Sequence, residues 1–251
     1  MLKPTLSIVT VVFNGEEFLE KTIRSVINQT YQNIEYIIID GDSTDRTNEI
    51  ITVYKKQIAL VLRESDDGIY DAMNKGINLA TGDFILFINA GDELFDIDVV
   101  TRLFENFDNE DAFYGNTQLV NDQGQAICRT EVPGTLTWNS LLFGMVISHQ
   151  SIIISTKCIN DYDLQYKVVS DHDWIISALK KCRKVKNSKL IISKYLVGGF
   201  SNQNFYISWR ERLNITFSYY GTLGVFINVF LFIKAIAKRF IKKILFINNY
   251  E

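Results

Sequence analysis

The sequence predicts an α/β protein built on a mostly parallel, doubly wound sheet. Short β-branched runs alternate with amphipathic helical segments in the first part of the chain, as they do in folds of this class. Three of the apolar runs lead to acids, at Asp40, at Asp66 with Asp67, and at Asp92. Open α/β sheets bind ligands outside the carboxyl ends of their strands, so these acids predict a ligand that carries hydroxyl groups or a cation. The 251 residues, 47% of them apolar, suffice for a sizeable core.

The first half of the chain is expected to alternate strand and helix. Runs rich in β-branched residues predict strands buried on both faces, over Ser7–Phe13, Ile34–Asp40, Ile58–Arg63 and Asp83–Asn89. Asn14, with Glu17 three residues later, resembles a capping box that opens the first helix. A second helix is expected around residues 50–54. A third is predicted over Ile69–Ala80, with Gly82 as its C-terminal stop.

After Asp92 the alternation stops, so the second half is predicted to be mixed. The expected elements are a helix over Val99–Phe107, strands at Ala112–Tyr114 and Ser151–Ser155, a helix over Asp171–Cys182 and a strand near Leu190–Ser193. Asn121–Gly124 has the composition of a hairpin turn. No linker separates the halves, which predicts one domain over residues 1–204, divided into a ligand-binding half, 1–92, and a second half, 93–204.

Residues 205–251 are predicted to form a separate helical, amphipathic tail. Leu213 to Ile233 contains no charged residue, and five basic residues follow without an acid, at Lys234, Lys238, Arg239, Lys242 and Lys243. The densest apolar part, Val225–Ile233, is shorter than the roughly 20 residues that a spanning helix needs. An apolar stripe with the basic residues off it favours a helix lying on an anionic membrane surface. A helix pair that covers the core, or a dimer seam, is the alternative.

Composition restricts the partners and the compartment. A net charge of −3 and a pI near 5.5 give no bulk attraction to nucleic acid, which we therefore exclude as a partner. The three widely spaced cysteines, Cys128, Cys158 and Cys182, lack a zinc-ligand pattern and are typical of reduced thiols. The N-terminus lacks the features of a signal peptide. We expect a cytoplasmic protein, peripheral on the inner face of the cell membrane if the tail binds lipid.

Each acid at a strand end has two interpretations. Asp40 can accept hydrogen bonds from a nucleobase or a ribose, but taken alone it is better explained as the cap of the following turn. Asp66–Gly68 precedes a helix, where an acid stabilises the N-terminus. Asp92 follows the flexible Gly91 and lies near the side-chain oxygen of Asn89. It is a candidate ligand of Mg²⁺ or Mn²⁺, which need only one or two carboxylates when substrate phosphates complete the shell, or else the cap of a turn.

A second acidic cluster surrounds His172. On a helix Asp171 and Asp173 point about 200° apart, so at most one of them faces a given site. Asp171, at the helix start, is a candidate general base that takes a proton from a hydroxyl, and an N-cap is an equal alternative for it. His149 is a candidate phosphate contact or an ordinary polar residue.

Four segments, taken in their order and spacing, resemble family 2 glycosyltransferases with the GT-A fold: Ser7–Asn14, Ile39–Asp45, Asp67–Gly76 and Ala80–Asp83. The resemblance covers about Leu6 to Ser201. It is strongest to the bacterial enzymes that build exopolysaccharides of the colanic acid type, lipopolysaccharide and glycolipids.

This resemblance implies a UDP- or GDP-linked sugar donor bound across residues 1–92, with residues 93–204 facing the acceptor. The implied substrate-binding residues are Thr10, Val12, Phe13, Asp40, Asp67, Asn89, Asp92 and His149. The family's Asp-x-Asp metal motif falls on Asn89–Asp92, where the first acid is replaced, so Asp92 carries the expected contact with Mg²⁺ or Mn²⁺. The family's Glu-Asp base motif falls on Ser170 and Asp171, which singles out Asp171 as the base.

The implied activity is an inverting, non-processive transfer of a sugar to a hydroxyl of a glycan or a lipid-linked acceptor in cell-surface polysaccharide synthesis. The sequence lacks the Gln-x-x-Arg-Trp motif of processive synthases. One alternative is a sugar nucleotidyltransferase, which the acidic segment Phe13–Glu17 disfavours because a triphosphate loop would be basic. The other is a non-catalytic, membrane-attached protein that retains the fold.

Overall fold

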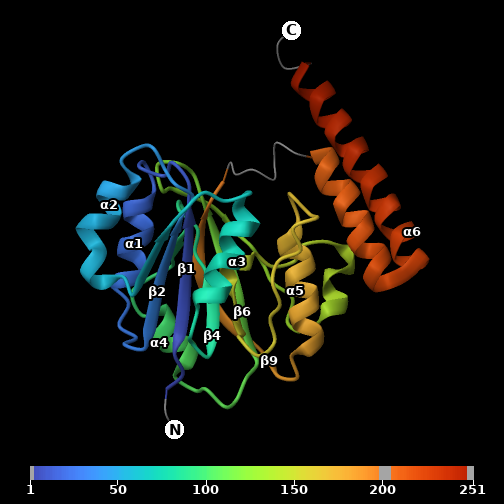
Figure 1. Cartoon of the computed structure of the whole chain (residues 1–251). Helices are drawn as coiled ribbons and strands as arrows, with labels where there is room; N and C mark the ends of the chain where they lie inside the picture. Colours follow the sequence, from blue (N-terminus) through green and yellow to red (C-terminus); the bar gives the residue numbers. More distant parts are fainter. Residues whose placement is uncertain (1–2, 198–204, 248–251) are drawn as a thin grey trace.

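The computed structural model describes residues 3–197 and 205–247, with side chains up to residue 234. A nine-stranded mixed sheet forms its centre, in the order β3-β2-β1-β4-β8-β6-β9-β5, and β7 pairs with β6 beside this path. Helices cover both faces of the sheet (Figure 1). The predicted α/β class, parallel at first and mixed later, is confirmed.

The parallel part contains strands β1 to β4 and helices α1 to α3. Their bounds are Leu6–Val12 (β1), Leu19–Ile27 (α1), Ile34–Asp40 (β2), Thr47–Tyr54 (α2), Leu60–Arg63 (β3), Ile69–Leu79 (α3) and Phe84–Phe87 (β4), with a 3₁₀ turn, η1, at Lys55–Gln57. β1 is buried at every position and pairs in parallel with β2 and β4. Because successive residues face opposite sides of a strand, Ile8 packs in one core and Val9 in the other.

The first helix starts later than the sequence predicts. α1 begins at Leu19, and Asn14 adopts a left-handed backbone conformation with φ 48°. The Asn14 backbone N–H donates to Ser43 Oγ (2.8 Å), and its Oδ1 accepts from the Thr44 N–H (2.9 Å). The capping-box prediction is therefore wrong, because the Asn14 side chain ties the end of β1 to the neighbouring loop instead.

The second half mixes strand directions. Its elements are Glu93–Leu94 (β5), Val99–Phe104 (α4), Ala112–Val120 (β6), Ala126–Arg129 (β7), Trp138–Phe143 (η2), His149–Ser151 (η3), Ile152–Ser155 (β8), Ser170–Lys181 (α5) and Val185–Leu196 (β9). β8 runs antiparallel to β4 and β6, whereas β9 runs parallel to β6. The predicted hairpin turn is confirmed, because Gly124 N–H donates to Asn121 O (2.8 Å) between β6 and β7.

The C-terminal helix, α6 (Phe205–Ile247), breaks at Gly221, whose φ of 65° and ψ of −161° are not helical. Figure 1 shows the result as a helical hairpin next to α5. The two arms meet where the rings of Trp209 and Phe232 lie 5.0 Å apart. The inner side of the hairpin packs on the main body: Ile215 is fully buried, and Asn228 Nδ2 donates to Leu142 O (2.9 Å). Part of the predicted tail thus covers the core.

The outer side of α6 exposes large apolar side chains, among them Leu223, Phe226, Phe230 and Ile233. By length and composition alone, Phe205–Lys234 could cross a membrane, with a mean hydropathy of 1.5. The break at Gly221 divides this stretch. The predicted basic residues after Lys234, and the apolar residues among them, lie outside the side chains that the structure describes, so the amphipathic pattern there stays a prediction.

Candidate active site

Two adjoining cavities lie at the ends of β1 and β4, on either side of Ile69. The first, of about 470 Å³, is lined by Val11–Phe13, Asp66–Ile69, Ala72 and Lys167. The second, of about 450 Å³, is lined by Phe18, Ile69, Tyr70, Met73, Asn89, Ala90, Asp92, Asp122, His149, Gln150, Val168, Asp171 and Tyr195–Val197. Together they form a site that extends from the parallel strands to the start of α5.

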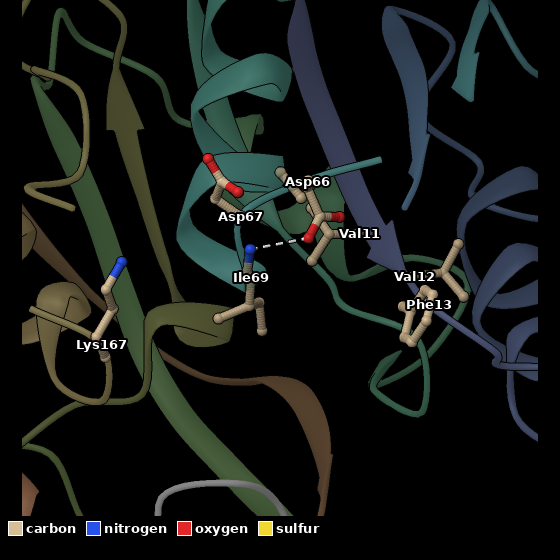
Figure 2. A pocket seen from close by; sticks show the side chains of 9 residues that line it. Val11, Val12, Phe13, Asp66, Asp67, Ile69 and Lys167 are labelled. Atoms are coloured by element: carbon tan, nitrogen blue, oxygen red, sulfur yellow. Dashed lines mark hydrogen bonds between the residues drawn. The ribbon is translucent and has the colours of Figure 1, made fainter. Parts of the chain in front are cut away.

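The first cavity is apolar in its floor and charged at its edges. Figure 2 shows Lys167 and Phe13 on opposite sides of Ile69, with Asp66 and Asp67 above it. Asp66 Oδ1 accepts from the Gly68 N–H (2.9 Å), and Gly68 has a φ of 115° that suits glycine. An apolar floor with an exposed aromatic ring, one ammonium group and carboxylates suits a flat, polar-edged ligand of the nucleotide class.

A chain of polar contacts crosses the second cavity. Asn89 Nδ2 lies 3.3 Å from His149 Nε2, and His149 Nδ1 lies 3.3 Å from Asp171 Oδ2. These contacts form together when Nδ1 carries the histidine proton and Nε2 accepts from the amide. Asp171 Oδ1 accepts from the His172 N–H (2.9 Å) and, at 3.4 Å, from the Tyr70 hydroxyl. Asp171 is therefore a carboxylate oriented by three partners at the wall of the cavity.

Tyr70 is available only as a donor in this arrangement. Burial, followed by the nearby Asp171 carboxylate, raises the pKa of Tyr70, so its hydroxyl stays protonated. Its single proton is shared between the Val168 carbonyl, at 2.9 Å, and Asp171 Oδ1, at 3.4 Å. Tyr70 thus connects α3 of the parallel half to the segment that precedes α5.

Asp92 is nearly buried, with 5% of its surface exposed. Its Oδ2 accepts from Gln150 Nε2 (2.8 Å), and its Oδ1 accepts from the Leu196 N–H (3.2 Å). Burial raises the pKa of Asp92 to about 6, although the Gln150 hydrogen bond, the nearby His149 and the Leu196 N–H each lower it. This carboxyl group is thus held at the cavity wall in an environment that disfavours its charge.

The residues near Asp92 offer oxygen ligands for a divalent cation. Asn89 Oδ1 is buried and has no hydrogen-bond partner. Each carboxylate oxygen of Asp92 keeps a second lone pair beside the hydrogen bond that it accepts. The described part of the chain holds no cluster of three His, Cys, Asp or Glu side chains that could form a cage. The set fits a cation whose shell is completed by substrate oxygens.

Most of the predicted site residues line these cavities. Val12, Phe13 and Asp67 line the first one. The second is lined by Asn89, Asp92, His149 and Asp171.

Thr10 and Asp40 do not reach the cavities. Both are fully buried. Thr10 Oγ1 donates to Ile88 O (2.7 Å). Asp40 Oδ1 accepts from the Ser43 N–H (3.0 Å), and its Oδ2 lies 3.5 Å from Arg63 Nε. The Thr10 side chain thus joins β1 to the end of β4, and the Asp40 side chain joins β2 to the following loop and to β3. Neither side chain lines the cavities, contrary to the substrate-binding role that the resemblance implies for both.

Three residues of the site were missed by sequence reasoning: Tyr70, Gln150 and Lys167. Lys167 carries the only ammonium or guanidinium group among the described side chains that line the two cavities. A weak signal existed, because Lys167 is a lone basic residue shortly before the acidic cluster around Asp171. For Gln150 the sequence offered only its position next to His149.

Comparisons with known proteins show the family of this chain. A family model described as glycosyl transferase family 2 matches residues 7–164. A PGL/p-HBAD biosynthesis glycosyltransferase of Mycobacterium bovis is 31% identical over 216 residues, which cover 80% of this chain and 81% of the relative. The Escherichia coli UDP-Glc:alpha-D-GlcNAc-diphosphoundecaprenol beta-1,3-glucosyltransferase WfgD is 26% identical over 193 residues, 76% of each chain.

Among solved structures, Staphylococcus aureus TarS 1–349 aligns with a TM-score of 0.65 at 18% identity. The alignment covers 85% of this chain and 65% of that chain. A likeness at this identity shows the fold, here the mixed α/β GT-A architecture. With a family model that matches more than half of its length, this chain belongs to glycosyl transferase family 2 and is a glycosyltransferase.

Proposed function

We propose that this enzyme moves one sugar from a nucleoside-diphosphate sugar to a hydroxyl of a glycan or lipid-linked acceptor, with inversion at the anomeric carbon. The observation that carries the proposal is the oriented carboxylate of Asp171 in a cavity that adjoins a nucleotide-sized cavity. TarS 1–349 has been crystallised with UDP and with UDP-GlcNAc, which supports a nucleotide-sugar donor here. The names of WfgD and of the mycobacterial relative support an acceptor in glycan or glycolipid synthesis.

The donor would lie across both cavities. Phe13 and Ile69 offer apolar surface to the base, and Asp67 can accept from ribose hydroxyls. Lys167 would place its positive charge near the donor phosphates. Asn89 and Asp92 would hold Mg²⁺ or Mn²⁺, which when bound supplies charge neutralisation for the diphosphate. The sugar would then reach into the second cavity.

Asp171 would act as the general base. The acceptor hydroxyl transfers its proton to the Asp171 carboxylate, while its oxygen forms a bond to the anomeric carbon. The bond from that carbon to the diphosphate oxygen breaks, and its electron pair leaves with the nucleoside diphosphate. Attack opposite the leaving group inverts the configuration. His149 and Tyr70 keep the carboxylate oriented, and a positioned base of this kind contributes about 10²- to 10⁴-fold.

The enzyme would work at a membrane surface on the cytoplasmic side. The exposed rings of Phe226 and Phe230 on α6, followed in sequence by a run of basic residues, suit an anionic lipid surface. In a flotation assay, vesicles that contain phosphatidylglycerol should carry the protein upward, and phosphatidylcholine vesicles should carry less. The double variant F226S/F230S should stay at the bottom. A wild-type protein that does not float with either vesicle would contradict membrane binding.

A donor panel tests the proposed reaction. The full chain is incubated with UDP- and GDP-linked sugars and Mn²⁺, and both the thermal shift and the release of nucleoside diphosphate are measured. At least one donor should raise the Tm and be hydrolysed or transferred. Pyrophosphate release from a nucleoside triphosphate and a sugar phosphate would instead indicate a nucleotidyltransferase. Donor binding without any turnover would indicate a non-catalytic protein that retains the fold.

A further inference from the structure

We propose that Glu211 of α6 is a positioning residue for Asp171, so that the C-terminal hairpin forms part of the catalytic apparatus. The inference rests on the proposed function, because it takes Asp171 as the base. It concerns a carboxylate that the reaction scheme does not use and that lies on the element expected, from the sequence, to be a separate tail.

Glu211 is buried, with 4% of its surface exposed, and its carboxylate binds three consecutive backbone amides. Oε1 accepts from the Lys167 N–H (2.9 Å), and Oε2 accepts from the N–H groups of Val168 (3.0 Å) and Val169 (3.2 Å). Hydrogen bonds to an ionised acceptor are about twice as strong as neutral ones. A buried carboxylate needs such partners, so the segment 167–169 and Glu211 fix each other's position.

The segment 167–169 leads directly into the site. Lys167 lines the first cavity, Val168 lines the second, and α5 with Asp171 follows. The Val168 N–H binds Glu211, whereas the Val168 carbonyl accepts a hydrogen bond from the Tyr70 hydroxyl. The same hydroxyl lies 3.4 Å from Asp171 Oδ1. The segment is therefore held at its N–H groups by α6 and at one carbonyl by α3. A displacement of a catalytic group by about 1 Å can lower the rate about 10²-fold. These two attachments therefore determine how accurately Asp171 is positioned next to an acceptor hydroxyl.

Attachment of the hairpin does not by itself require Glu211. Farther along α6, Tyr220 OH donates to Trp138 O (2.6 Å), and Asn228 Nδ2 donates to Leu142 O. Ile215 is buried in the same core cluster as Trp174 of α5. These contacts attach the hairpin to η2 and the core, and the two hydrogen bonds do not involve the segment 167–169. Loss of the Glu211 charge should therefore release the segment while the hairpin stays in place.

The test compares Glu211→Gln with Glu110→Gln. Glu110 is a matched control, because it is also 4% exposed and accepts a backbone N–H, from Asp108 at 2.6 Å. It precedes β6 and pairs with Lys186 (3.2 Å), and neither cavity includes it. Both variants should lower the Tm. At a temperature well below both midpoints, Glu211→Gln should lower kcat about tenfold or more. Because the released segment also carries Lys167, donor KM should rise by no more than the roughly tenfold expected for loss of the Lys167 charge. Glu110→Gln should keep kcat and donor KM within about twofold.

Amide hydrogen exchange gives a readout that does not depend on turnover. Exchange at residues 167–169 should become faster in Glu211→Gln and stay unchanged in Glu110→Gln. Glu211→Asp keeps the charge on a shorter side chain, so its kcat should lie between those of Glu211→Gln and wild type. This variant replaces Glu211→Gln in both measurements if Glu211→Gln does not fold. Wild-type kcat and wild-type exchange in a folded Glu211 variant would overturn the inference. Absence of turnover in the wild-type protein would instead refute the proposed function, and the exchange measurement would still decide whether Glu211 fixes the segment.

Discussion

The first half, residues 3–92, proposed above to hold the donor, and the second half, residues 93–197 with α6, proposed to face the acceptor, position their acids by different means. They are called the donor half and the acceptor half below. In this first half Asp40 ends β2 and Asp92 follows β4, two parallel strands that flank β1, so local chain geometry brings both acids to the same edge of the sheet. In the acceptor half Asp171 lies in the first turn of α5 and is oriented by Tyr70 from α3 and by His149 from η3. The donor half therefore positions its acids at the ends of strands, and the acceptor half orients Asp171 through contacts between segments that are distant in the sequence.

Even within the donor half, a strand end does not decide a role. Asp40 is fully buried and holds the following turn through the Ser43 N–H, whereas Asp92 lines the second cavity. The difference arises from what packs above each carboxylate. Arg63 of β3 approaches Asp40, while the η3 turn with Gln150 approaches Asp92 and leaves an opening beside it. Substitutions at these positions should separate the two kinds of acid.

The largest effect is expected at Asp171. Asp171→Asn keeps the size of the side chain but removes the base, so kcat should fall by about 10²- to 10⁴-fold, or about 3 to 5 kcal/mol in the activation barrier. Donor binding, measured by thermal shift with the donor that the panel identifies, should stay within about twofold. A variant with wild-type turnover would remove Asp171 from the mechanism and leave the acceptor half without its base.

The same contrast explains what could be predicted from the sequence. β1 to β4 were found within a few residues, because β-branched runs and helical periodicity report local structure directly. β9 was predicted only near Leu190–Ser193, yet it extends over Val185–Leu196, because pairing with β6 extends it through a lysine-rich stretch. The burial of Asp40 and the position of Lys167 follow from tertiary contacts and leave no local pattern in the sequence.

The C-terminal region shows the same limit. Its apolar composition predicts a helix, and α6 is one. Composition does not tell which side of that helix faces the core, since Gly221 and the contact of Asn228 with Leu142 decide it. Glu211 is a lone acid before a charge-free stretch, and no local pattern marks it as buried, because its three amide partners come from residues 167–169.

Asp92→Asn should change the dependence of stability on pH. The folded-state pKa of Asp92 is raised from 3.8 to about 6, so the folded protein binds this proton more tightly than the unfolded chain does. The stabilisation is complete below about pH 4 and is lost as the pH rises through about 6. Asparagine cannot ionise, and Gln150 can turn its amide to form a hydrogen bond with it. As the pH rises between these limits, the free energy of unfolding of the variant should therefore increase relative to wild type by up to about 3 kcal/mol.

Urea unfolding in EDTA at pH 4.5 and pH 7.5 measures this gain. Asp161→Asn, at an exposed position, serves as the control and should show no such change. The free energies of unfolding of Asp92→Asn and wild type could differ by the same amount at both pH values. This result would contradict a buried environment that disfavours the Asp92 charge. It would make Asp92 resemble an exposed acid.

A smaller effect, on stability alone, is expected at Asp40. Asp40→Ala leaves the buried Ser43 N–H without its acceptor, which should lower the free energy of unfolding by about 1 to 3 kcal/mol. Asp40→Asn keeps an oxygen for this bond and should cost less. Because the carboxylate lies outside both cavities, kcat and donor KM should stay within about twofold. A clear rise in donor KM would return Asp40 to the donor-binding residues and weaken the contrast with Asp92.

The smallest effect is expected at Lys167, where the two halves meet. Lys167→Gln removes the one described ammonium group of the first cavity but leaves the backbone N–H that binds Glu211. Loss of one exposed charge contact with the donor phosphates should raise donor KM about tenfold, or about 1.4 kcal/mol, with kcat less affected. Lys157→Gln, another lysine of the acceptor half that lines neither cavity, is the control and should leave KM unchanged. An equal KM for Lys167→Gln and wild type would mean that the donor phosphates are held by the donor half alone, with the acceptor half supplying only the base.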